Sequence, residues 1–142
     1  MTPVSTVREA TYRFLTRELG TRRDPEELAS AAVAIYEALL KILSPLLGNV
    51  GSQALFRRSL NLTKGTFPCY EEARTAKDDA LLEAVSACLR QQQPDIAREA
   101  SVALLIAFVE LLATFIGERL TRQLLQEAWP EILTVTSEET HS

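Results

Sequence analysis

The sequence predicts an all-α protein: a single five- or six-helix, mostly antiparallel bundle with a long central C-terminal helix. No segment alternates apolar and polar residues with β-branched enrichment, whereas apolar residues recur at spacings of three and four. The six prolines and five glycines fall mostly at intervals that suit helix boundaries. With 142 residues, 46% hydrophobic, we expect one helical domain over residues 1–134 and a frayed polar tail over 135–142.

The first two helices have recognisable boundaries. We expect one helix from Pro3 to a stop at Gly20. The run Asp24-Pro25-Glu26-Glu27 then starts a second helix, because its aspartate can cap, its proline suits the first helical position and its glutamates face the positive end of the helix dipole. This second helix should end near Pro45 or Gly48.

Two shorter helices follow. The pair Gly51-Ser52 reopens a helix that Gly65 closes. A fourth helix is expected from Tyr70 or Asp78 to Arg90.

The last helix is expected to be the longest. From Asp95 no breaker except Gly117 occurs before Pro130, so it could reach about 35 residues, or roughly 50 Å. Such a length exceeds what a compact domain of this size needs, which means that Gly117 kinks the helix or that part of it serves a partner subunit. One face should be buried core: Leu104, Phe108, Leu111, Phe115 and Ile116.

The opposite face of this helix carries a seam of mostly small residues at heptad spacing. Its members are Ala103, Ala107, Glu110, Thr114, Gly117 and Thr121. Small side chains let a second helix approach closely, which would explain a glycine in mid-helix. We therefore predict a homodimer whose interface contains this seam, with Trp129 as an aromatic anchor. The competing prediction is a monomer whose first two helices enclose the seam.

Glu110 is the one charged residue of the seam. A buried carboxylate needs a partner or an altered pKa. Glu110 could lie at a rim or pair with an arginine of an earlier helix, or it could be the ligand-binding acid of a pocket. The sequence contains none of the Glu-x-x-His pairs that build di-metal sites in helical bundles.

The run from Thr114 to Pro130, TFIGERLTRQLLQEAWP, resembles the terminal helix of a family of small bacterial all-helical proteins of no known activity. The resemblance implies a bacterial cytoplasmic protein and brings no catalytic residue with it.

Several classes of chemistry lack the residues they need. The one histidine, His141, is next to last, so histidine-based catalysis and metal binding are not expected, and we predict a non-enzyme without cofactor or metal. Without a signal peptide, Cys69 and Cys88 are expected as free thiols in the cytoplasm. The apolar stretch Ala100–Gly117 contains Glu110 and is expected to be a buried helix, not a membrane span.

Positive charge gathers in the basic segment, residues 55–77, where Arg57, Arg58 and Lys64 could contact nucleic acid or another anion. Its sequence faintly resembles a helix-turn-helix, but Pro68 would fall in the first turns of the reading helix, and the net charge of −4 opposes phosphate binding.

The sequence thus favours a self-associating, non-enzymatic helical module for protein–protein interaction or regulation, with itself or an unidentified protein as partner. The alternatives are a small nucleic-acid-binding regulator that uses the basic segment, and a ligand sensor with a pocket around Glu110.

Overall fold

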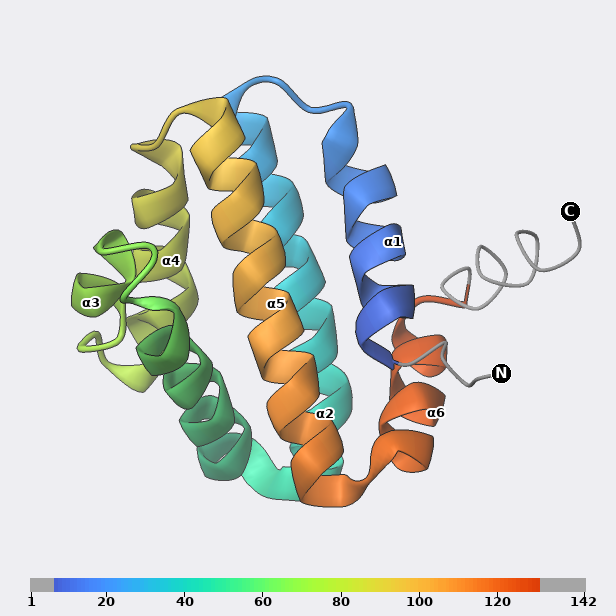
Figure 1. The fold of residues 1–142 in the computed structure, drawn as a ribbon. Coiled ribbons are helices and arrows are strands. Elements are labelled where there is room, and N and C mark those ends of the chain that lie inside the picture. The colour runs from blue at the N-terminus through green and yellow to red at the C-terminus, as the bar shows by residue number, and fades with distance from the viewer. Residues whose placement is uncertain (1–6, 131–142) are drawn as a thin grey trace, which may run out of the picture.

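A computed structural model describes residues 7–130 as an antiparallel helical bundle, which confirms the predicted fold class (Figure 1). The expected helix start at Pro3 and the tail at 135–142 lie outside the described residues. No strand occurs in the described range. The elements are α1 (Val7–Gly20), α2 (Pro25–Thr63), α3 (Cys69–Ala73), the 3₁₀ turn η1 (Asp78–Ala80), α4 (Leu81–Arg90), α5 (Pro94–Ile116) and α6 (Glu118–Ala128).

Helix α5 is the centre of the bundle. It lies along α2 and has α1 on one side and α4 on the other (Figure 1). Two buried tyrosines attach other helices to its backbone: the Tyr36 hydroxyl donates to the Ser101 carbonyl at 2.8 Å, and the Tyr70 hydroxyl donates to the Ala100 carbonyl at 2.7 Å. These bonds satisfy hydroxyl groups that would otherwise be costly to bury.

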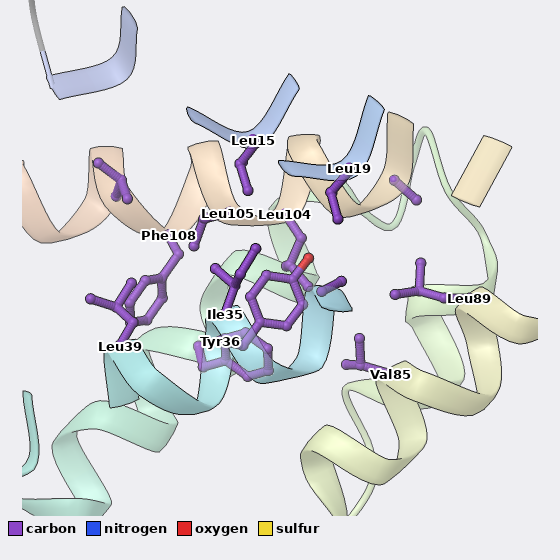
Figure 2. Close-up of a cluster of buried hydrophobic side chains, with 14 of the residues drawn as sticks. Leu15, Leu19, Ile35, Tyr36, Leu39, Val85, Leu89, Leu104, Leu105 and Phe108 are labelled. Atoms are coloured by element: carbon purple, nitrogen blue, oxygen red, sulfur yellow. The ribbon is translucent and has the colours of Figure 1, made fainter. Parts of the chain in front are cut away.

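The core is formed where four helices meet (Figure 2). Leucines of α1 and α5 face Tyr36 and its neighbours on α2, while Val85 and Leu89 approach from α4. Phe56 joins this cluster through ring contacts to Tyr36 at 5.5 Å and Phe108 at 5.8 Å between centroids. These three aromatic rings fill space between the two longest helices, and the burial of apolar surface throughout the core is the dominant favourable contribution to folding.

Helix α2 begins where the sequence predicts. The Asp24 carboxylate accepts a hydrogen bond from the Glu26 backbone N–H at 3.2 Å, and Pro25 occupies the first helical position. The expected break is also present: Gly48 has φ 81° and ψ 159° and kinks the chain. Pro45 does not end the helix, and helical structure resumes after Gly48 without a loop.

Of the two starts expected for the helix that ends at Arg90, Asp78 agrees with the structure, because the 3₁₀ turn η1 begins there and α4 follows it directly to Arg90. Tyr70 belongs to the separate helix α3. Helix α3 is a single short turn, and α4 starts only at Leu81. Residues 74–77 between them are not helical, and the Arg57 guanidinium donates to the carbonyls of Arg74 and Ala76, the latter at 2.7 Å. A charged partner on α2 thus replaces the helical hydrogen bonds of these carbonyls.

The last helix does not run continuously for 35 residues, because Gly117 interrupts it, as the first of the two alternatives held. Gly117 has φ 98° and ψ 152°, so α5 ends at Ile116 and α6 turns back toward α1 (Figure 1). The Glu118 carboxylate accepts a hydrogen bond from the Val7 backbone N–H at 2.7 Å. At its far end, the Trp129 ring packs on Phe14 with 5.1 Å between centroids. Both ends of α6 are therefore fixed to α1.

This turn also corrects one predicted core position. Leu104 and Phe108 are fully buried, and Leu111 and Ile116 are half-buried, but Phe115 is 69% exposed. Helix α6 packs against α1, α2 and α5 and leaves Phe115 uncovered.

Gly117 gives a direct test of the break. A Cβ at Gly117 would meet nothing within 4 Å, and the same holds at Gly65, whose φ is not positive. The two sites differ in backbone strain and not in space. We expect Gly117→Ala to lower the free energy of unfolding by about 1–3 kcal/mol in urea titrations, because its φ and ψ lie in a region open almost only to glycine. Gly65→Ala should not lower it, and equal losses at both sites would contradict this account.

The buried tyrosines predict loss of stability in alkali. Burial raises the pKa of Tyr36, against a smaller opposing effect of its hydrogen bond to Ser101, and burial also raises the pKa of Tyr70. A group whose pKa is raised on folding contributes its full stability below the unfolded-state value, about 10 for tyrosine, and loses it above. We expect tyrosinate absorbance from both residues to appear together with the loss of helical circular dichroism above about pH 10.

The double variant Tyr36→Phe, Tyr70→Phe should show a shallower alkaline fall in stability. Absorbance equivalent to more than one tyrosinate in a fully helical protein would contradict the burial argument.

Candidate functional site

The seam predicted from the sequence is the outward stripe of α5. Ala103 and Ala107 are half-buried, and Glu110 and Thr114 are exposed. No other described helix covers this stripe, although α1 and the C-terminal half of α2 lie on its two sides. The monomer therefore does not enclose the seam in the way that the competing prediction requires.

A groove separates the stripe from α1. It has a volume of about 490 Å³ and an apolar floor that includes Ala103, Ile106 and Ala107. Tyr12 lines its α1 side and is 56% exposed. The rim is polar and carries Arg8 and Glu110 at one end and Arg98 and Glu99 at the other.

Glu110 is a rim residue. Its carboxylate lies 3.4 Å from the Arg8 guanidinium, and both side chains are more than half exposed. This matches the alternative in which it pairs with an arginine of an earlier helix, and such a solvated pair contributes little to stability. Arg98 at the other end is more firmly held, since it donates to the Arg22 carbonyl at 2.7 Å and to the Leu19 carbonyl at 3.3 Å.

A second groove, on the other side of the stripe, has a volume of about 760 Å³. It lies where the kink of α2 meets the end of α5, and it is lined by Leu46, Leu47, Leu55, Arg58, Leu111 and Phe115, among others. Leu46 and Phe115 are both large, apolar and exposed. Because the sequence predicted Phe115 as a core residue, it did not predict this groove. The feature of the sequence that could have indicated the groove is the pair of glycines, Gly48 and Gly117, at which the two bordering helices can be interrupted.

Three members of the predicted interface are not on the outward surface of α5. Thr121 is 0% and Trp129 8% exposed, because α6 packs both of them against the rest of the bundle. Gly117 ends α5 with a positive φ, which favours glycine by itself, and no atom of the described chain lies within 4 Å of the position that its Cβ would take. The outward face, as used below, is the stripe Ala103, Ala107, Glu110 and Thr114 with its two flanking grooves.

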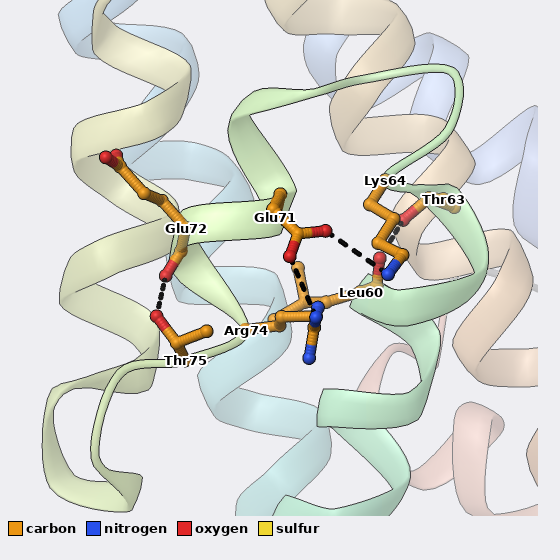
Figure 3. Close-up of polar contacts among 7 residues, drawn as sticks. All are labelled: Leu60, Thr63, Lys64, Glu71, Glu72, Arg74 and Thr75. Carbon is orange, nitrogen blue, oxygen red and sulfur yellow. Dashed lines mark hydrogen bonds and ion pairs between the residues drawn. The ribbon is translucent and has the colours of Figure 1, made fainter.

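Most of the basic segment takes part in the fold. Arg57 is half-buried against the carbonyls that it caps. The Lys64 ammonium lies 3.2 Å from Glu71, which also accepts a hydrogen bond from Arg74 at 2.8 Å (Figure 3). These two donors lower the pKa of Glu71, and the hydrogen bond from Arg74 has the larger effect. Arg58 is exposed and lines the second groove.

The helix-turn-helix resemblance has no structural counterpart. The basic residues Arg57 and Arg58 lie in the last part of α2, and the element that follows, α3, has five residues. A recognition helix needs several turns to place side chains in a major groove.

The two cysteines are joined as the disulfide Cys69–Cys88, which corrects the expectation of free thiols. The 18 intervening residues fold back through α3 and η1, and this brings the two Cα atoms to 5.7 Å. Among residues 7–130 no group of three or more histidine, cysteine, aspartate or glutamate side chains could hold a metal ion.

Two described helices are long and apolar enough to cross a membrane, α2 and α5. Their most apolar 18-residue windows have mean hydropathies of 1.5 and 2.0, and 33% and 44% of these windows is buried in the bundle. The core helix of a bundle can have the same length and composition, so these values do not decide between the two.

No family model, no curated protein and no solved structure matches this chain.

Neighbouring arginines allow the structural role of the basic segment to be tested. Arg57→Ala should lower the free energy of unfolding by about 1–3 kcal/mol, because it leaves half-buried carbonyls without their donor. Arg58→Ala, one residue away and exposed, should change it by less than about 0.5 kcal/mol. If chemical denaturation gave equal losses in the free energy of unfolding for the two variants, the capping role of Arg57 would be contradicted.

Proposed function

We propose that this protein is a non-enzymatic helical interaction module that self-associates as a homodimer through the outward face of α5. One observation carries the proposal. Two large apolar side chains, Phe115 of α5 and Leu46 of α2, are exposed together in the second groove, at the end of the most apolar helix of the described chain. An apolar surface that the monomer leaves uncovered favours association.

The outward face is large enough for a stable dimer. Helix α5 has 23 residues, which corresponds to about 35 Å at 1.5 Å per residue. Grooves on both sides widen the face to about two interhelix distances, roughly 20 Å. The resulting footprint of about 700 Å² is close to the roughly 800 Å² that each partner buries in a standard interface.

The charges of the face suit a second copy of the same chain. The groove against α1 carries two guanidinium and two carboxylate groups, from Arg8, Arg98, Glu99 and Glu110, so it has no net charge that would select an acidic or a basic partner. Because Arg8 and Glu110 are adjacent, a two-fold axis near them would place each arginine beside the glutamate of the other copy.

The alternatives receive less support from the geometry. Arg57 and Lys64 have partners within the fold, which leaves the exposed Arg58 and Lys77 as the cations of the basic segment for nucleic acid. The Glu110 carboxylate is solvated at a groove rim, whereas a small-molecule sensor usually surrounds its ligand.

Light scattering coupled to size-exclusion chromatography tests the proposal. At micromolar concentration we expect a mass of twice the chain mass of 15.8 kDa. Phe115→Asp should shift the equilibrium to monomer, because it places a charge in the apolar groove. Since Phe115 is exposed, the fold should be unaffected. Leu62→Asp is the matched control, because Leu62 is also exposed and apolar but lines neither groove.

Charge reversal locates the two-fold axis. Glu110→Arg should weaken the dimer by bringing four cations together, and the double variant Arg8→Glu, Glu110→Arg should restore it. A wild-type protein that stays monomeric at all concentrations overturns the proposal. A dimer that none of these substitutions weakens places the interface elsewhere.

A further inference from the structure

The disulfide Cys69–Cys88 joins two helices that differ in stability. Cys69 is the first residue of α3, a helix of five residues, which is too short to be stable alone. Cys88 lies in α4, whose inner face is packed into the core through Leu81, Val85 and Leu89. The Cα separation of 5.7 Å falls within the range that natural disulfides span.

The two ends of the bond also differ in accessibility. Cys69 is half-buried, whereas Cys88 is 6% exposed. The Cys69 end of the bond is therefore the more accessible of the two to a small thiol in solution. The neighbouring residues 71 and 72 are exposed, so the approach to this end of the bond lies at the surface.

The core does not depend on this bond. Helix α4 keeps its buried leucines and valine when the bond is opened, and α3 remains anchored by Tyr70, whose hydroxyl donates to the Ala100 carbonyl. The loop after α3 keeps Arg57 on its two carbonyls. Both redox states can therefore be folded, and they differ in how firmly residues 69–80 are held to α4.

We propose that Cys69 and Cys88 form a reversible redox site that low-molecular-weight thiols and disulfides open and close, and that its state sets the local stability of residues 69–80. The proposal does not rest on self-association. It also accounts for two cysteines in a chain that otherwise shows no cysteine chemistry.

The exchange balances with a thiol of the glutathione class as reductant. Its thiolate attacks Sγ of Cys69, the Sγ–Sγ bond breaks, and Cys88 leaves as a thiolate that takes up a proton. A second thiolate then attacks the reagent sulfur of the mixed disulfide and releases Cys69 as a thiol. In sum, one protein disulfide and two small thiols give two protein thiols and one small disulfide; closing runs in reverse with the oxidised reagent.

Hydrogen exchange read by mass spectrometry tests the local effect. The full chain is equilibrated in reduced or in oxidised glutathione, and its state is confirmed by alkylation. We expect amides of residues 69–80 to exchange at least tenfold faster in the reduced protein, and those of α5 to exchange at the same rate in both. The melting temperature should fall by roughly 10 °C on reduction, because the closed loop no longer restricts the unfolded chain.

The double variant Cys69→Ser, Cys88→Ser should reproduce the reduced protein and be insensitive to glutathione. Leu62→Asp, which keeps both cysteines, should retain the full response. The proposal is overturned if both cysteines remain open to alkylation after treatment with oxidised glutathione. It is equally overturned if native protein resists reduction until it unfolds globally, or if residues 69–80 exchange at the same rate in both states.

Discussion

The packing of α5 is the constraint on which the rest of the structure depends. Apolar residues occupy almost its whole circumference, and a single neighbour can cover only one side. Helix α2 lies along it, and α1 and α4 flank it. Tyr36 of α2 and Tyr70 of α3 donate hydrogen bonds to its consecutive carbonyls at Ser101 and Ala100. Helices α1, α2 and α4 together leave the outward stripe of α5 uncovered. The candidate interface therefore follows from the way in which the core packs around α5.

Two glycines determine where the packing of other helices around α5 ends. Gly48 and Gly117 both adopt positive φ. The bend in α2 and the turn between α5 and α6 lie at the same end of the bundle (Figure 1). At Gly117 the chain turns toward α1 and covers Phe14 with Trp129, and it leaves Phe115 in the open on the other side. The same turn thus completes the core on one side of α5 and opens a groove on the other.

Several charged side chains form hydrogen bonds with backbone groups at the ends of helices. Arg57 and Arg98 each donate to two backbone carbonyls where a helix has ended, and Glu118 accepts from the start of α1. These contacts satisfy backbone groups at helix ends, which would otherwise need water or capping side chains. A cluster of arginines in the sequence can therefore serve to cap helix ends within the fold and need not indicate a site for an anionic ligand.

The sequence by itself determined the all-α class, the Asp24 cap, a break near Pro45 or Gly48 and the small-residue stripe of α5, because helical period, capping and the preferences of proline and glycine are local properties. Only the tertiary structure decided that Gly117 reverses the chain, that Trp129 and Thr121 are core, that Phe115 is exposed and that Cys69 meets Cys88. Each of these depends on the direction that the chain takes after a break. A glycine permits that direction, but the contacts of distant helices select it.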